Sequence, residues 1–488
     1  MLVRNNISKY IVFIVAVILA ILLSGLSGIL GFVGLGLILS IWYRYLVKDP
    51  VLAFLFSFSI VLNMGYYFIH ASFGLPRFFQ YPYLFFILCF LVMFSPQLTT
   101  ERQSGLDLHM KRLILVLLIF IGYQLFISIL IKLEQDIYGT VLIVFRNLLQ
   151  IVGVLILIPS YYLAKKNPTR FIDTIVLVAF ILYGVFFITY FTGIPLMKIY
   201  FFERFEGYSL TRVYFQNSGY ASYVFSLSIL CILLGVRYKF KKILYISSIL
   251  MIGSVLITLS RLMILTMIGT VIVLLFLLRT YIGISFKKKI TFFSSISFVL
   301  LILSLFFPGI LYHVFETFKL SFYEMIGTLP EGTTQGRTSY ELVNVLPVIK
   351  ENLFFGTGFQ DFWNDEANYG DFGISDVPFL ANLGIYGLFG MLIYFLSQFM
   401  IIGRIFKFIM ILKKDPGWFR KHYLLELILL LTLATNQIVS LFFRTVYISY
   451  ELVLGELRIF SGFQIGMIYG LCNYLEKSFS YFSMKDLK

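Results

Sequence analysis

Three arginines occupy the polar breaks between long apolar segments of the sequence, at Arg212, Arg261 and Arg337. A guanidinium group keeps its charge at every physiological pH and can donate two parallel hydrogen bonds to one phosphate. A set of arginines at a membrane surface would therefore suit a diphosphate held at the level of the lipid headgroups. Taken singly, Arg212 and Arg337 could equally be solvated loop charges, and Arg261 could be an interfacial arginine that extends to lipid phosphate.

Two further residues could take part in chemistry at the same level. Asp376 precedes a return of the chain into an apolar segment and is the best-placed candidate for a general base, although this position also suits a helix N-cap. Arg146 lies within an apolar segment, about eight residues from its outward-facing end, which is roughly 12 Å at the rise of 1.5 Å per helical residue. It could line a polar cavity or extend to the interface.

The composition requires that membrane helices position these residues. Of the 488 residues, 60% are apolar and 13% are charged, and the mean hydropathy is +0.92, which excludes a water-soluble enzyme. The sequence predicts an all-α polytopic membrane protein of about 12–14 helices, forming one membrane domain over residues 1–488. The expected spans are 10–24, 27–43, 50–71, 80–95, 113–131, 139–163, 172–194, 219–235, 243–259, 262–278, 290–312, 379–403, 422–443 and 459–475.

The positive charges set the orientation of these spans. With both termini in the cytoplasm, 27 of the 39 lysines and arginines fall on the inner side and 11 on the outer side, leaving Arg146 inside a span. The net charge of +15 therefore reflects cytoplasmic loops, and no nucleic-acid partner is expected. Arg212, Arg261, Arg337 and Asp376 then share the outer face.

Two outer connections are long, at residues 195–218 and 313–378. The larger one carries ten acidic residues and only three cations, and its aromatic content favours a folded cap over a disordered loop. Thr338 to Glu341 has the spacing of a capping box, so a helix is expected to begin there and to kink or break at Pro347. Arg337 would stand just before the helix start, at the positive end of its dipole, and these two positive features together make an anion site plausible. Alternatively, Glu341 could simply be the partner of Thr338 in the capping box, with no contact to a ligand.

Several other chemistries lack their sequence signals. The three cysteines lie inside apolar runs and the four histidines are scattered, so neither a disulfide framework nor a metal site is expected. The sequence contains no nucleotide-binding glycine motif, and coupling to ATP is not indicated.

Four stretches resemble motifs of the O-antigen ligase and O-antigen polymerase superfamily. Their order and their shared outer face carry the resemblance, which covers roughly residues 205–395. The stretches are Arg212 through Asn217 to Tyr220, Ser260-Arg261, Gly336-Arg337 followed by Val348 to Gly358, and Asp376 to Gly390 with its glycines at 384, 387 and 390.

The resemblance implies a glycosyltransferase in the bacterial cytoplasmic membrane, with its active site facing the periplasm or exterior. The donor would be a glycan on a polyprenyl diphosphate, and the acceptor a sugar hydroxyl of a second lipid-linked repeat unit, without a metal or nucleotide cofactor. Arg337, Arg261 and Arg212 would hold the diphosphate while Asp376 takes the acceptor proton. The other expected substrate contacts are Asn217, Arg146, Tyr340 and Glu341. A chain-length regulator is a further conceivable partner.

The sequence also departs from the family pattern. Ligases of this superfamily typically carry a histidine where this sequence has Asp376, which favours the polymerase branch. Asn352-Leu353 replaces the Pro-Leu of the family run. A ligase, a lipid-linked oligosaccharide flippase and a transporter remain alternatives, although a flippase should show two related halves. A polyprenyl-phosphate-sugar transferase with catalytic acids in its first outer loop does not fit, because that loop holds no acid.

Overall fold

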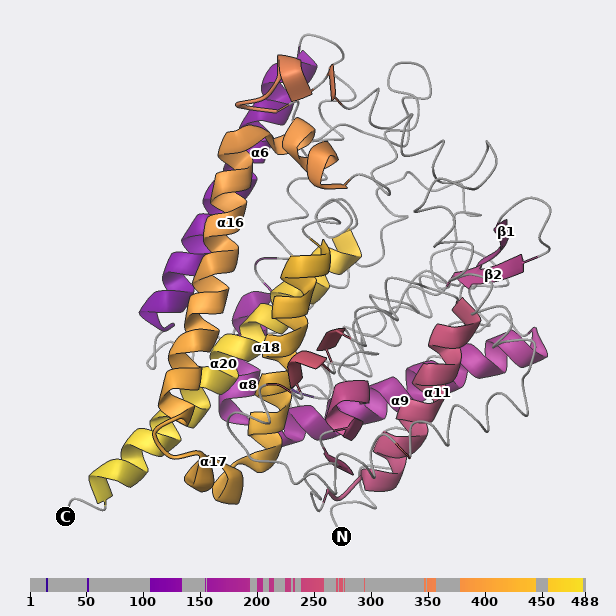
Figure 1. Ribbon diagram of the computed structural model, residues 1–488, viewed down its shortest axis with the longest axis vertical. Helices are drawn as coiled ribbons and strands as arrows, with labels where there is room; N and C mark the ends of the chain where they lie inside the picture. The colour runs from indigo at the N-terminus through magenta and orange to yellow at the C-terminus, as the bar shows by residue number, and fades with distance from the viewer. Residues whose placement is uncertain are drawn as a thin grey trace.

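The computed structural model describes residues 106–133, 156–193, 200–204, 210–214, 238–258, 349–356, 378–444 and 455–485, with shorter pieces at 224–229, 231–232, 269–270, 272–274 and 346–347 and single residues at 15, 51, 154, 276 and 294. Its elements (Figure 1) are α6 Leu108–Leu133, α8 Leu157–Lys166, α9 Pro168–Thr192, β1 Tyr200–Arg204, β2 Leu210–Tyr214, α11 Lys241–Thr258, α16 Pro378–Leu412, α17 Pro416–His422, α18 Leu424–Arg444 and α20 Gly455–Lys485.

Three of these helices are long and apolar enough to cross a membrane, within Leu108–Ile127, Pro168–Thr192 and Tyr386–Leu412, and Leu424–Ile438 is a shorter apolar helix. The expected class, a helical polytopic membrane protein, is confirmed. Helical structure also occurs inside the predicted spans 219–235, 243–259, 262–278 and 459–475. The first four predicted spans lie outside the described residues, apart from Val15 and Val51.

The sequence places stop and start signals at the helix ends. Proline occupies the first turn of α9 and of α17, where its missing N–H costs no helical bond. The Asp415 carboxylate caps α17 by accepting the Trp418 N–H at 2.9 Å. Gly193 ends α9 in a left-handed conformation with φ 68°. Single residues, Asn167 and Tyr423, connect α8 to α9 and α17 to α18.

Helices α8 and α20 approach each other closely because of two glycines one turn apart on α20. A Cβ added to Gly470 would lie 2.5 Å from the carbonyl oxygen of Tyr161, and one added to Gly466 would collide with the carbonyl oxygen of Leu157. The spacing Gly466-x-x-x-Gly470 is the small-residue pattern that lets membrane helices meet backbone to backbone. The two glycines therefore allow α8 and α20 to pack backbone to backbone.

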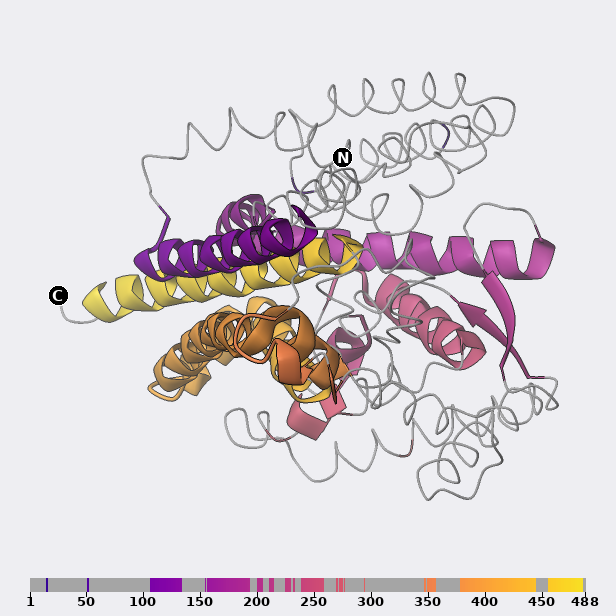
Figure 2. The same ribbon diagram turned by 90° about the horizontal axis from the view of Figure 1, so that it is seen from above.

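Helices α9 and α11 run parallel to each other. Near their beginnings, the Tyr238 hydroxyl donates to Asp173 at 2.9 Å, and further along Gly253 lies against the ring of Phe187. Their far ends therefore lie together, beside the β1–β2 hairpin (Figures 1 and 2). The hairpin lies within the predicted outer loop 195–218, where no strand was expected from the sequence.

Helices α6 and α16 run antiparallel and form a second pair. Phe120 of α6 packs edge-on against Tyr386 of α16 with ring centroids 5.5 Å apart. At the other end of the pair, Lys407 Nζ lies 3.4 Å from His109 Nε2. The alternation of helix directions predicted from the charges agrees with these contacts.

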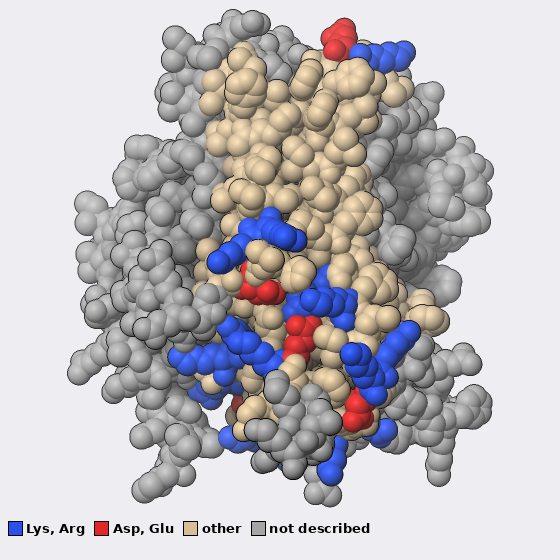
Figure 3. Space-filling model, turned by 90° about the vertical axis from the view of Figure 1, so that its left-hand side faces the viewer, with Lys and Arg blue, Asp and Glu red and all other residues tan. Residues whose placement is uncertain are grey.

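Exposed cations mark one end of the bundle. Lys111, Arg112, Lys407, Lys413 and Lys414 are all exposed at the ends that the charge pattern assigns to the inner side. Figure 3 shows lysine and arginine side chains over the lower part of one face, while its upper part is largely uncharged. The described surface therefore has the asymmetry expected of a protein in a bilayer.

The helices differ from the predicted spans mainly in length. Helix α16 ends at Leu412 and not at 403, and α20 ends at Lys485 and not at 475. Their added turns are partly polar and lie at the cationic end, where helical structure can continue beyond the hydrocarbon. Within the predicted span 139–163, a described helix begins only at Leu157 and continues to Lys166.

Candidate functional site

Residues 349–356 belong to the family-like stretch Val348 to Gly358, and they are docked on α16. The Leu388 N–H donates to the Leu353 carbonyl at 2.9 Å, and the Phe389 N–H donates to the Phe354 carbonyl at 3.1 Å. Helical structure over 346–347 and 349–351 ends in a turn that closes with the Gly356 N–H on the Asn352 carbonyl at 2.8 Å. Two stretches that suggested the same family from sequence are therefore in direct contact.

This docking depends on a break in α16 at Gly387. The residue has φ 61° and ψ 179°, a backbone conformation that is essentially restricted to glycine. A Cβ there would lie 2.5 Å from the Gly356 nitrogen and from the Phe355 carbonyl carbon. Gly387 thus allows both the break and the close approach of the loop backbone.

Gly390 allows a third segment, α6, to reach the same point. A Cβ on Gly390 would lie 2.9 Å from a ring carbon of Tyr123. The Tyr123 hydroxyl donates to the Phe355 carbonyl at 2.7 Å and lies 3.1 Å from the Tyr386 carbonyl oxygen. The loop, the broken helix and α6 therefore converge on one phenol group.

An exposed aromatic surface borders this junction. Phe355 and Phe389 stack in parallel with ring centroids 5.6 Å apart and an interplanar angle of 4°. Both rings are more than half exposed, as is that of Phe354. These rings lie next to the carbonyl and amide groups that dock the loop, at the end of α16 opposite the cationic end (Figure 1).

A second group of backbone segments assembles around the hairpin. Arg212 lies in β2 opposite Phe202 of β1, in an antiparallel register. Strand β2 contacts α11, whose last residue, Thr258, comes three positions before Arg261. The fold therefore brings the backbone that carries Arg212 to the helix that leads to Arg261.

The predicted site residues themselves are only partly covered by the structure. For Arg212 the structure describes the backbone, within β2. The other predicted residues lie outside the described residues: Arg146, Asn217, Arg261, Arg337, Tyr340, Glu341 and Asp376. Asp376 comes two positions before the start of α16 at Pro378. Their roles stay predictions.

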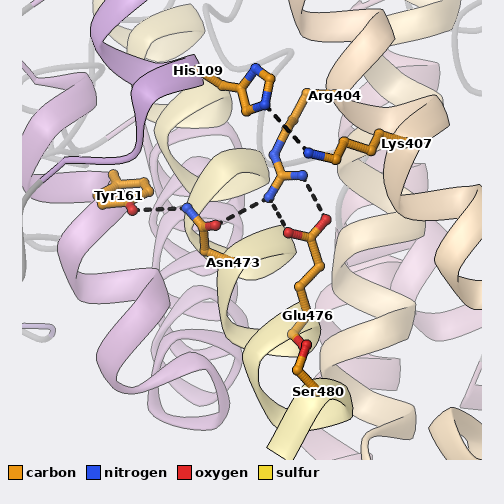
Figure 4. A network of polar contacts seen from close by, with 7 residues as sticks. All are labelled: His109, Tyr161, Arg404, Lys407, Asn473, Glu476 and Ser480. Atoms are coloured by element: carbon orange, nitrogen blue, oxygen red, sulfur yellow. Dashed lines mark hydrogen bonds and ion pairs between the residues drawn. The ribbon is translucent and has the colours of Figure 1, made fainter.

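A polar network at the opposite end of the bundle was not foreseen from sequence (Figure 4). Arg404, almost completely buried, donates two hydrogen bonds to the Glu476 carboxylate at 2.6 and 2.7 Å and a third to Asn473 at 3.2 Å. Asn473 in turn donates to the Tyr161 hydroxyl at 2.8 Å. The network joins α16, α20 and α8, and Arg404 lies about 26 Å along the helix from Gly387 at the usual rise. It therefore holds the bundle together and does not belong to the junction at Gly387.

Two sequence signals could have indicated these contacts. Tyr123 places a hydroxyl group in an apolar run, where such a group needs a partner. Gly466-x-x-x-Gly470 is readable as a helix-packing motif in the last apolar segment. Neither signal names the partner, which is far away in the sequence in both cases.

One region of the chain is similar to a known protein family. Residues 246–395 match the family model described as O-antigen ligase. This region is similar to O-antigen ligases. The match supports the place of the protein in the superfamily of O-antigen ligases and polymerases, and it does not separate the two activities. No curated protein matches the sequence.

The O-antigen ligase region contains the docked segment 349–356 and the first part of α16 through Phe395. It also contains Arg261, Arg337 and Asp376. Tyr123 and the hairpin lie outside it. The junction at Gly387 therefore combines two segments of the family region with a helix from the N-terminal part of the chain.

Proposed function

We propose that this protein is a polysaccharide polymerase that joins oligosaccharide repeat units carried on polyprenyl diphosphate at the outer face of the bacterial cytoplasmic membrane. The observation that carries the proposal is the docking of segment 349–356 on α16 at Gly387, because both segments belong to the O-antigen ligase region. Each of these segments follows a candidate catalytic residue, Arg337 in the first case and Asp376 in the second. Their contact supports a shared site.

The proposed reaction is an inverting glycosyl transfer. The acceptor hydroxyl oxygen attacks the anomeric carbon of the donor, the bond from that carbon to the diphosphate oxygen breaks, and its electron pair leaves with the diphosphate. Asp376 takes the proton of the acceptor hydroxyl. Arg337, Arg261 and Arg212 stabilise the charge of the departing diphosphate, and the contact between β2 and α11 supports the nearness of the last two.

The remaining predicted residues would bind the sugars or the diphosphate. Asn217 follows β2 by three positions, and Tyr340 and Glu341 follow Arg337 closely. Arg146 would line the membrane side of the site. The leaving group already carries a diphosphate, so the proposal needs no nucleotide.

The test is glycan synthesis by the purified protein in liposomes supplied with lipid-linked repeat units. Wild-type protein should lengthen the glycan by whole repeats, read by mass spectrometry of the lipid-linked products. Arg261→Ala and Arg337→Ala should each lower the rate by about 10²–10³-fold, the usual effect of removing one pre-placed contact to a developing charge. Asp376→Asn should lower it by about 10²–10⁴-fold.

Lys350→Ala is the matched control, because Lys350 is an exposed cation in the same predicted outer loop. Full activity of both arginine variants would overturn the diphosphate clamp, and full activity of Asp376→Asn would remove only the base. Movement of single repeats between leaflets without lengthening would identify a flippase instead.

The description of the matched family favours one second candidate, an O-antigen ligase. Such an enzyme would move a finished glycan to a different lipid acceptor and would not lengthen the donor. Adding a lipid acceptor to the same liposomes separates the two activities, because only a ligase would transfer glycan to it.

A further inference from the structure

The contacts of Tyr123 give it a place that the proposed function does not use. In an uninterrupted helix the Gly390 N–H would donate to the Tyr386 carbonyl four residues earlier. The break at Gly387 falls inside this turn. The Tyr123 hydroxyl lies 3.1 Å from the Tyr386 carbonyl oxygen, and the Tyr123 ring lies against Gly390. A phenol from α6 thus lies at the turn of α16 that the break interrupts.

The same hydroxyl also holds the docked loop. Its shortest contact is the 2.7 Å hydrogen bond to the Phe355 carbonyl, 232 residues away in the sequence. Phe355 stacks on Phe389, and the two neighbouring carbonyls, of Leu353 and Phe354, accept N–H groups from α16. Three successive loop carbonyls therefore accept hydrogen bonds. Those of Leu353 and Phe354 accept from α16, and that of Phe355 accepts from Tyr123 of α6.

The ring of Tyr123 is fixed where its hydroxyl is needed. It lies against Gly390, where a Cβ would come within 2.9 Å of it. Phe120, one turn earlier on α6, packs against Tyr386 and is buried. The position of the phenol follows from the packing of α6 on α16, so the loop takes its position from a membrane helix.

We propose that Tyr123 is a positioning residue that anchors the segment 349–356 to the broken helix α16 and so holds the loop that follows Arg337 in place for glycosyl transfer. The inference rests on the proposed function. It adds a residue outside the O-antigen ligase region to the machinery. Tyr123 touches no reacting atom in this account and acts through the loop.

The test compares Tyr123→Phe with wild-type protein in liposomes. The variant keeps the ring and its packing but leaves the Phe355 and Tyr386 carbonyls without the hydroxyl. Hydrogen–deuterium exchange at the Leu388 and Phe389 amides should become faster, because these amides are protected by the docked loop. Turnover should fall by about 10–100-fold with a smaller change in KM, since misplacing a reacting group by about 1 Å costs rate at the chemical step.

Tyr469→Phe is the matched control. The Tyr469 hydroxyl also donates to a carbonyl of α16, that of Met400 at 3.3 Å, but far from the loop. This variant should match wild-type protein in amide exchange at 388 and 389 and in turnover.

Two results would overturn the proposal. One is a Tyr123→Phe protein whose amide exchange equals that of Tyr469→Phe, and the other is faster exchange with unchanged turnover. A wild-type protein that does not extend lipid-linked repeats would overturn the proposed function instead. The exchange measurement needs no substrate and would still report whether Tyr123 anchors the loop.

Discussion

At the residue scale, glycines and one tyrosine define the junction of the family segments. Gly387 lets the backbone take a conformation that other residues avoid, and it leaves space for the loop backbone. Gly390 leaves space for the ring of Tyr123. Two of the spaced glycines in this segment, at 387 and 390, thus have a physical explanation in the contacts that each one permits. A larger residue at either position would have to move backbone or a packed ring.

Gly387→Ala should separate the loop from α16. The Cβ would collide with loop backbone, and the left-handed φ would add about 1–3 kcal/mol of strain. Faster exchange of the Leu388 and Phe389 amides and a lower midpoint of thermal unfolding in detergent would show this. Gly403→Ala is the control on the same helix, because a Cβ there meets nothing within 4 Å. Equal behaviour of the two variants would contradict the explanation.

At the scale of elements, helix pairs are joined by different means at different depths. Helices α8 and α20 meet through Gly466 and Gly470, and α6 meets α16 through Phe120 and Tyr386. At the cationic end, the ion pair between the buried Arg404 and the partly exposed Glu476 joins α16 to α20. Removing one member of such a pair leaves a buried charge without a partner, which is usually strongly destabilising. The junction at Gly387 therefore belongs to a bundle whose opposite end is joined by this ion pair.

Gly470→Ala should destabilise the bundle without touching the candidate site. A Cβ at this position lies 2.5 Å from the Tyr161 carbonyl oxygen, so α8 and α20 must move apart. Overpacking of this kind costs about 1–3 kcal/mol. The thermal midpoint in detergent should fall, whereas Gly184→Ala in α9, where a Cβ meets nothing within 4 Å, should leave it nearly unchanged. A Gly470→Ala protein as stable as wild type would show that the two backbones are not in contact.

At the scale of the whole molecule, the two ends of the bundle differ in charge and in chemistry. One end carries exposed lysines and arginines and the Arg404 network, and the docked loop lies at the opposite end of α16 (Figures 1 and 3). An anionic donor presented on the outer leaflet would meet only the second end. The proposed function therefore requires that the loop end face the outside.

Cysteine labelling in whole cells tests this orientation. Lys350→Cys should react with a membrane-impermeant thiol reagent, and Lys414→Cys should react only after the membrane is permeabilised, because both positions are exposed at opposite ends. Wild-type protein gives the background of the native cysteines, of which Cys231 and Cys472 are buried. The reverse pattern of labelling would place the proposed active site in the cytosol and contradict the function.

The sequence by itself determined the helical membrane class, because apolar runs and charged breaks are local properties that a bilayer sorts directly. It also placed Gly387 among the spaced glycines of a segment that resembles the family, because this pattern can be read from the residues alone. Only the tertiary structure decided that Tyr123 meets Phe355 and that Arg404 meets Glu476. These partners are 232 and 72 residues apart in the sequence. The sequence shows that a buried hydroxyl or guanidinium group needs a hydrogen-bond partner. Which residue becomes that partner depends on how the helices pack.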